Sequence, residues 1–287
     1  MRTNQPLILI TNDDGIASHG LRAAVQAARP LGEILVVAPA RQLSGSGRGI
    51  WADPQGAIRR YPLVVDGQSV TAYEVGASPA LVVLHGIIEL APRQPALVIS
   101  GINFGENVGA DVTGSGTVGA ALQAAACGVP CLASSLQTPK EHHKTNSHEV
   151  DFAAAVHFTR LFARSILDCT LPADVDLLKM DIPADATPQT PWRFTRVSKY
   201  PYYETPPASR RRLADGLLPA EGAPAGLDYD AMTAPEQTEP DSDIYALRVD
   251  RVVSVAPLSL DLSSRVNLAE LHALLEAIAQ APHEPKA

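Results

Sequence analysis

The amino-acid sequence predicts an α/β fold with a mostly parallel sheet that helices cover on both faces. Four short runs are rich in strand-forming residues and almost wholly apolar, at residues 7–11, 33–39, 96–101 and 130–136. Helical patterns separate these runs, and the chain has no internal repeat. Strands without polar alternation are buried on both faces, and their alternation with helices is typical of parallel sheets.

The other elements of the N-terminal half follow from local signals. Residues 20–29 have a helical pattern, and a proline follows them directly. A weaker hairpin is expected within residues 57–75. Ser78, which precedes a proline, suits the N-cap of a helix that runs to about Leu90. Residues 116–128 form an alanine-rich helix that ends on a glycine.

The C-terminal half is less regular. The pattern predicts a helix over residues 150–168 and a strand within residues 175–183. Residues 200–243 contain many proline, glycine and charged residues without a period, which is typical of a functional loop, of a disordered segment or of an arm to another subunit. Residues 244–258 return to strand character, and residues 268–280 form an amphipathic closing helix.

Composition narrows the class of protein. The chain has 287 residues, a net charge of -8 and a pI of about 5.5, whereas a non-specific binder of nucleic-acid polymers is more often basic. Cys127, Cys131 and Cys169 are too few for a disulfide framework, so we expect three buried thiols. Residues 1–11 contain no apolar stretch long enough for a signal peptide, so we expect none, and His85 and Glu89 interrupt the longest apolar run. We therefore expect a cytoplasmic protein without a membrane segment.

Two adjacent carboxylates follow the first strand. Asp13 and Asp14 would repel each other at the end of a buried strand unless a positive charge lies beside them. A divalent metal ion would supply that charge, since hard cations prefer oxygen ligands. In the alternative reading, Asp13 caps the next turn and Asp14 is solvated. This motif alone supports both readings equally.

Two further polar loops favour the metal site. Ser44 lies in a glycine-serine loop after the second strand, and Asn103 follows the third. The carboxyl ends of parallel strands share one edge of the sheet, where ligands bind in such folds. Hydroxyl and amide oxygens suit the same kind of metal as Asp13 and Asp14.

A possible anion site opens the alanine-rich helix. Ser115, Gly116 and Thr117 leave backbone N–H groups accessible, and the helix dipole favours a phosphate there. A simple Ser/Thr N-cap is the commoner use of these residues. The chain has neither a Walker lysine motif nor a GxGxxG after its first strand, so an ordinary P-loop or dinucleotide site is disfavoured.

Other motifs are weaker. Ser46 lies in "GSGRG", which is not the GxSxG of a nucleophile elbow, and no Ser-His-Asp arrangement can be assembled. His142, His143 and His148 lack the spacing of metal ligands, so a solvated surface is the better interpretation. The arginines at 210–212 read as a solvated face or as an arm that meets a partner.

In combination the motifs resemble the SurE survival-protein phosphatases, which are metal-dependent nucleotidases. The matching segments are "ILITNDDGI", "VVAPARQLSGSG", "LVISGINFGENVGADVTGSGTVGAAL", "GVPCLASSL", "RFTRVSKY" and "SDIYALRVDRVVSVAPLSLDL". The resemblance implies removal of the phosphate from nucleoside 5′- or 3′-monophosphates with one divalent ion, Mn or Mg, per subunit. It implies metal ligands at Asp13, Asp14, Ser44 and Asn103, and phosphate contacts at Asn107, Ser115, Gly116 and Thr117.

The same resemblance implies a three-layer α/β sandwich formed by a single domain. Residues 1–136 would be a Rossmann-like core that contains the active site. An extended hairpin arm at about 200–243 would exchange between subunits of a homodimer or homotetramer. Residues 244–287 would supply the closing strands and the C-terminal helix.

This chain departs from the usual family pattern in three places. Ala40 stands where the family usually has Asp, "GSGRG" replaces a loop with an Asn, and residues 78–83 replace Thr-Pro-Ala-Asp-Cys. The four metal-ligand positions are unaffected, but substrate preference is open. Arg48 adds a cation near the phosphate site, and we hypothesise that Arg48→Ala raises KM.

The predicted chemistry is in-line attack on phosphorus. A bound cation polarises a phosphoryl oxygen and lowers the pKa of a bound water. In this mechanism Asp13 is a ligand and possible base, and Asp14 is a ligand. An Asp13-phosphate intermediate is the alternative route. Two other functions stay open. The protein could bind nucleotides without turnover, or it could be a phosphatase for other phosphomonoesters or short polyphosphate.

Overall fold

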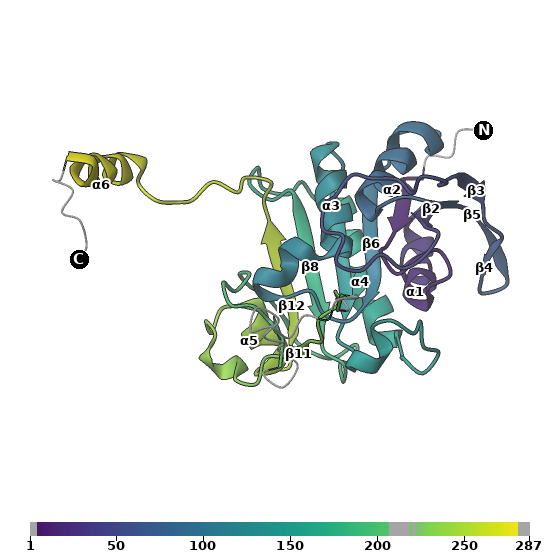
Figure 1. The fold of residues 1–287 in the computed structure, drawn as a ribbon. Coiled ribbons are helices and arrows are strands. Elements are labelled where there is room, and N and C mark those ends of the chain that lie inside the picture. Colours follow the sequence, from purple (N-terminus) through teal and green to yellow (C-terminus); the bar gives the residue numbers. More distant parts are fainter. Residues whose placement is uncertain (1–4, 207–218, 220–221, 224, 281–287) are drawn as a thin grey trace.

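The computed structural model describes residues 5–206, 219, 222–223 and 225–280 and shows a central sheet between two layers of helices (Figure 1). The order of its strands is β3-β5-β2-β1-β6-β7-β8-β12-β9, and β4 also pairs with β5. These strands span β1 Leu7–Thr11, β2 Glu33–Pro39, β3 Ile58–Arg60, β4 Leu63–Val65, β5 Gln68–Val75, β6 Leu97–Phe104, β7 Cys131–Leu136, β8 Leu177–Ile182, β9 Trp192–Phe194 and β12 Val253–Leu258.

Most neighbouring strands run parallel. The block from β5 through β2, β1, β6 and β7 to β8 is parallel throughout. The strand β12 is antiparallel to β8 and parallel to β9, and the short β3 and β4 are antiparallel to β5. The predicted α/β class with a mostly parallel sheet is therefore confirmed. All six strands of the parallel block end at the same edge of the sheet.

Helices cover both faces of this sheet. The α-helices are α1 His19–Ala28, α2 Pro79–His85, α3 Gly116–Ala126, α4 Ala153–Asp168, α5 Asp243–Arg248 and α6 Leu268–Gln280. One core lies between the sheet and α1 with α4, and the other lies between the sheet and α2 with α3. The strand β1 serves both, because Ile8 and Ile10 enter the first core while Leu7 and Leu9 enter the second.

Short helical turns complete the chain. They are η1 Arg29–Leu31, the π-type η2 Gly86–Leu90, η3 Gly109–Gly114, η4 Lys140–His142 and η7 Pro235–Gln237. Ser78 is the N-cap position of α2, as predicted, but its hydroxyl makes no capping bond and instead accepts a hydrogen bond from the backbone N–H of Trp51. The strand β6 runs three residues beyond the predicted end, so Asn103 lies within the strand rather than after it.

The prediction of strand character throughout 244–258 is wrong in its first half. Residues Asp243–Arg248 form α5, and only Val253–Leu258 form the strand β12. Ser242 caps this helix, because its hydroxyl accepts a hydrogen bond from the N–H of Tyr245 at 3.2 Å. The cap stabilises a helix in a segment whose Ile, Tyr and Val residues otherwise favour a strand.

The expectation of three buried thiols is wrong for two of them. Cys131 is buried on β7, Cys127 is half-buried at the end of α3, and Cys169 is exposed. Cys169 follows the last turn of α4, where the chain leaves the surface of the sheet. Its position at a helix end explains its exposure.

The predicted arm is described only at its base. The strands β10 Tyr203–Glu204 and β11 Asp230–Ala231 pair antiparallel. Most of the chain between them lies outside the described residues, so the extended arm stays a prediction, as does the division of the chain at 136 and 243. The helix α6 lies away from the sheet in Figure 1. No helix among the described segments has the length and apolar character needed to cross a bilayer.

Candidate active site

Loops that follow β1 and β2 meet at the carboxyl edge of the sheet. Asn12 shapes the first loop, because its side chain accepts from Gly15 N–H and donates to Gly15 C=O. The backbone N–H of Leu43, in the second loop, donates to the carbonyl of Asp13 at 2.8 Å. Asp13 is buried and Asp14 is half-buried at this junction. The predicted convergence of the first two loops is present.

Asp13 is held by the start of α3. Oδ1 of Asp13 accepts a short hydrogen bond from the hydroxyl of Thr117. Ser115 caps the helix, because its Oγ accepts from Val118 N–H at 3.1 Å. A Cβ on Gly116 would lie 2.7 Å from Oδ2 of Asp13, so only glycine allows the helix to approach the carboxylate this closely. The predicted phosphate-binding turn is therefore in contact with Asp13.

Asp14 is held from two directions. Its Oδ1 accepts from Nε2 of Gln42 at 3.0 Å, and its Oδ2 accepts from the backbone N–H of Phe104 at 3.2 Å. Gln42 Nε2 also lies 3.1 Å from Oγ of Ser44. The loop after β2 and the end of β6 therefore fix the Asp14 carboxylate, and Gln42 connects it to Ser44.

The pKa values of both carboxylates are raised in the folded chain. Burial raises the pKa of Asp13 to about 6, although the hydrogen bond from Thr117 opposes this shift. Burial and the negative charge of Asp13 together raise the pKa of Asp14 well above its ordinary value. A cation near these oxygens would favour the ionised forms and lower both pKa values.

The donor set fits a hard divalent cation. The side chains predicted to bind it are two carboxylates, the hydroxyl of Ser44 and the amide of Asn103, whose Nδ2 donates to Gly105 C=O at 2.8 Å and so leaves Oδ1 as its acceptor. Among the described residues no group of three or more His, Cys, Asp and Glu side chains is placed to hold a metal. Ser46 Oγ is buried without a hydrogen-bond partner and would lie 2.8 Å from a Cβ on Gly116. This hydroxyl near Asp13 is therefore a polar group that a ligand could satisfy.

Asn107 follows β6 and is bound to the two next strands. Its Nδ2 donates to Oγ of Ser135 on β7 at 2.8 Å, and its backbone N–H donates to Asp181 on β8 at 2.7 Å. Within the described chain no hydrogen bond joins Asn107 to the other predicted site residues. It lies beyond the end of β6, and its contact with phosphate stays a prediction.

One residue beside the site, Gln42, was missed in the sequence. The side-chain Nε2 of Gln42 lies within hydrogen-bond distance of three acceptors. Besides Asp14 and Ser44, it donates to the carbonyl of His143 at 2.7 Å. The His143 ring lies against Gly105, where an added Cβ would meet its Nε2 at 2.9 Å. His143 is therefore half-buried rather than fully solvated. Nothing in the sequence distinguishes Gln42 from an ordinary loop glutamine.

Arg48 lies along α3 rather than at its first turn. Its Nε donates to Oε1 of Gln123 at 3.0 Å. Gln123 is six residues beyond Thr117, or about 9 Å along the helix. The structure therefore does not bring Arg48 to the start of the helix. The arginines at 210–212 lie outside the described residues.

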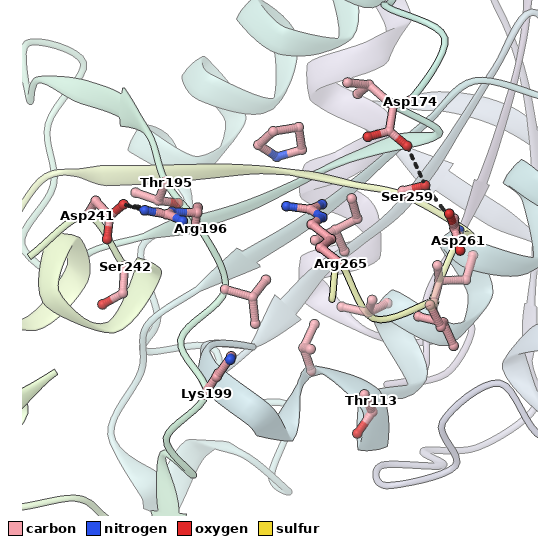
Figure 2. Close-up of a pocket in the computed structure, with 18 of the residues that line it drawn as sticks. Thr113, Asp174, Thr195, Arg196, Lys199, Asp241, Ser242, Ser259, Asp261 and Arg265 are labelled. Carbon is pink, nitrogen blue, oxygen red and sulfur yellow. Dashed lines mark hydrogen bonds and ion pairs between the residues drawn. The ribbon is translucent and has the colours of Figure 1, made fainter. Parts of the chain in front are cut away.

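A separate cavity of about 850 Å³ lies between α3 and the segment that leads to α6. Figure 2 shows charged residues in its wall, including Arg196 beside Asp241, and Ser259 between Asp174 and Asp261. Val118 and Leu122 of α3 face this cavity, whereas Thr117 faces Asp13. None of the predicted site residues lines it, so it is not the site at the edge of the sheet.

The comparisons with known proteins agree with the motifs. The model of the family described as "Survival protein SurE" matches residues 8–204. This chain belongs to the SurE family. The matched range covers every predicted site residue from Asp13 to Thr117, together with the base of the predicted arm at β10.

Similar members of the SurE family match over almost their whole length. The "5'-nucleotidase SurE" of Thermococcus kodakarensis is 37% identical over 272 residues, which cover 94% of this chain and 98% of the relative. That of Methanocella arvoryzae is 39% identical over 278 residues, covering 93% and 97%. The crystal structure of the SurE protein from Aquifex aeolicus is similar with a TM-score of 0.70 and 26% identity, covering 96% of this chain and 100% of that one.

Proposed function

We propose that this protein removes the phosphate of nucleoside 5′- or 3′-monophosphates in a reaction that depends on a divalent metal ion. The observation that carries the proposal is the adjacent pair of Asp13 and Asp14 beside the start of α3, whose pKa values are both raised. Relatives that match nearly the full chain are named 5'-nucleotidases, and metal dependence is general among SurE nucleotidases.

One ion per subunit, Mn or Mg, would be held by Asp13, Asp14, Ser44 and Asn103. The oxygen character of these four groups and the high pKa values of the carboxylates support this assignment. When bound, such an ion neutralises the two carboxylates and polarises a phosphoryl oxygen.

The phosphate would be held by Asn107, Ser115, Gly116 and Thr117. The first backbone N–H groups of α3 have no partner within the helix, and the helix dipole favours an anion there. Ser115 Oγ already caps Val118 N–H, so its contribution is its place in the turn rather than its hydroxyl. Gly116 has no side chain to keep the phosphate away from these amides.

Asp13 is the group best placed to act on the reacting atoms. Thr117 fixes the orientation of its carboxylate, which can accept a proton from an attacking water. Alternatively, Asp13 itself attacks phosphorus and forms a phosphoenzyme. Single-turnover quenching distinguishes these routes, because only the second gives a trapped covalent species.

The test is phosphate release from a panel of nucleoside 5′- and 3′-monophosphates and an aryl phosphate, with Mn²⁺, Mg²⁺ or chelator. Asp13→Asn is compared with the wild type, and Asp168→Asn, an exposed carboxylate at the end of α4, is the matched control. Metal-dependent release that only Asp13→Asn abolishes would support the proposal and identify the substrate. If the folded protein released no phosphate with any metal, a nucleotide-binding role would replace the enzymatic one.

We also propose that the protein forms a homodimer or homotetramer through its C-terminal half. The apolar side chains of α6 support this, because Leu268, Leu271, Leu274 and Leu275 are all exposed in the single chain. The paired base of the arm at β10 and β11 is consistent with an extended hairpin. Light scattering after gel filtration gives the subunit number, and a monomer at micromolar concentration would contradict the proposal.

A further inference from the structure

A fully buried lysine lies next to the loop that presents Asn107. Lys179 is on β8, and its side chain has no exposed surface. Its ammonium group contacts the carboxylates of Asp181 and Asp243, and it donates to the carbonyl of Asn107 at 2.9 Å. These three acceptors match the three N–H donors of an ammonium group. The lysine is therefore fully hydrogen-bonded without water.

Asp181 also binds the backbone of Asn107. Its Oδ1 accepts the backbone N–H of Asn107 at 2.7 Å, while its Oδ2 contacts Lys179. Both polar groups of the Asn107 backbone are therefore bound to two charged side chains of β8. Asp181 is paired in register with Ser135 of β7, which accepts from the Asn107 carboxamide. Two neighbouring strands thus fix the backbone and the side chain of one loop residue.

Asp243 joins this cluster to the next segment of chain. It accepts from Gly109 N–H at 3.2 Å and from Ser198 N–H at 3.0 Å, and its Oδ2 lies 3.1 Å from Lys179 Nζ. Burial acts to lower the pKa of Lys179, but the carboxylates of Asp181 and Asp243 outweigh it and raise that pKa. Lys179 is therefore a cation in the folded protein at neutral pH.

Stability alone does not explain such a cluster. Replacing buried ion pairs by well-packed apolar residues is often neutral or stabilising, and the rest of β8 is apolar. Instead, five hydrogen bonds of the cluster involve the backbone of Asn107, Gly109 and Ser198. This concentration of charge around one short loop points to a requirement for its geometry.

We propose that Lys179 and Asp181 are positioning residues of the phosphate site, which fix the Asn107 backbone so that its carboxamide stays at the edge of the sheet where phosphate binds. This inference rests on the proposed function, in which Asn107 contacts phosphate. It goes further by assigning the orientation of that contact to two residues that touch neither substrate nor metal.

The test uses the double variant Lys179→Met/Asp181→Asn. It removes one charge of each sign, keeps an oxygen at 181 and takes away the donor to Asn107 C=O. We expect KM for the nucleoside monophosphate and the inhibition constant of inorganic phosphate to rise about tenfold, whereas the Mn²⁺ concentration for half-maximal activity changes less than about twofold. On an Asn107→Ala background the double change should have no further effect on KM.

Leu178→Ala is the matched control for a general loss of stability. Leu178 directly precedes Lys179 on β8, but its side chain packs into the core under α1 and α4. This control should lower Tm and leave KM and phosphate inhibition near the wild-type values. If the double variant fails to fold, Asp181→Asn alone should raise KM about threefold. Unchanged phosphate affinity in a folded variant, or effects that multiply with Asn107→Ala, would overturn the inference.

Titration of the Mn²⁺-loaded protein with inorganic phosphate separates this inference from the proposed function. Phosphate binding to the wild type without any turnover would contradict the nucleotidase proposal, and weaker binding by the double variant would still support the positioning role. Equal binding by both proteins would overturn the positioning role even if the wild type is active. Absence of phosphate binding in the wild type would overturn both.

Discussion

Thr117, at the start of α3, donates the proton of its hydroxyl to Oδ1 of Asp13, at the end of β1, across 104 positions of sequence. This bond attaches the helix that would hold the phosphate to the carboxylate that would act on it. The two parts of the proposed site therefore cannot move independently while the bond is intact.

The Thr117–Asp13 bond gives the first prediction. Thr117→Val keeps the shape of the side chain but removes the donor, so the Asp13 carboxylate loses its fixed orientation. We expect kcat to fall about tenfold or more, because a misplaced base loses much of its contribution. Steady-state kinetics at saturating Mn²⁺ measure the change. Thr117→Ser retains the hydroxyl and should keep kcat within about threefold of wild type, and equal losses in both variants would contradict the role of the bond.

Gly116 gives the second prediction. In Gly116→Ala the new Cβ would lie 2.7 Å from both Cβ and Oδ2 of Asp13 and 2.8 Å from Ser46 Oγ. We expect phosphate release to fall more than about a hundredfold and Tm to decrease, because α3 must move away from the carboxylate. Gly114→Ala is the control, since a Cβ there has no heavy atom within 4 Å. Near-normal activity in Gly116→Ala would show that the close approach is not required.

The buried charge of Asp13 gives the third prediction, for the metal-free protein. Its pKa of about 6 in the folded state lies above its ordinary value of 3.8, so the folded state binds more protons than the unfolded state between these values. The free energy of unfolding therefore decreases as the pH rises from about 4 to above 6, by roughly 3 kcal/mol from this group. Asp13→Asn removes that cost and should be the more stable protein at pH 8 in chelator.

Urea denaturation at pH 4 and pH 8 measures this difference. The advantage of Asp13→Asn should be about 1–3 kcal/mol at pH 8 and should disappear near pH 4, where the wild-type carboxyl is protonated. Added Mn²⁺ should stabilise the wild type and should stabilise Asp13→Asn much less. An Asp13→Asn protein that is the less stable of the two at pH 8 in chelator would contradict the predicted cost of burying this charge.

Gln42 gives the fourth prediction. Its amide reaches Asp14, Ser44 and the carbonyl of His143, so Gln42→Ala releases three loops at once. We expect the Mn²⁺ concentration for half-maximal activity to rise about three- to tenfold, because Asp14 and Ser44 lose their common support. Metal titration of the activity measures it. Gln26→Ala, which removes an exposed hydrogen bond to Asp66, should leave the metal requirement unchanged.

Much of the fold was predictable because its core strands carry no polar alternation. The strand β1 contributes to both cores, so every position needs an apolar residue and the run is unmistakable. The helix α5 was not predictable from composition, because Ile244 and Tyr245 favour strands and only the hydroxyl of Ser242 starts the helix. A single hydrogen bond at a helix end carries little weight against a run of β-forming residues.

The site was predictable where its functional residues are adjacent in the sequence. Asp13 and Asp14 stand out because paired charges rarely end a buried strand. Gln42 was missed because Asp14 and His143, two of its three partners, come from other loops, so its role exists only after folding. Lys179 did leave a signal, as a lysine within an otherwise apolar strand, but its partner Asn107 is 72 positions away.

The buried carboxylates at the end of β1 have a consequence for the lifetime of the protein in a cell. If a divalent ion occupies the site, it stabilises the folded chain, and a shortage of that ion raises the fraction of molecules that open transiently. Opened molecules are the substrates of cellular proteases. Metal supply would then control abundance as well as rate, so that starvation for the ion clears the inactive enzyme instead of storing it.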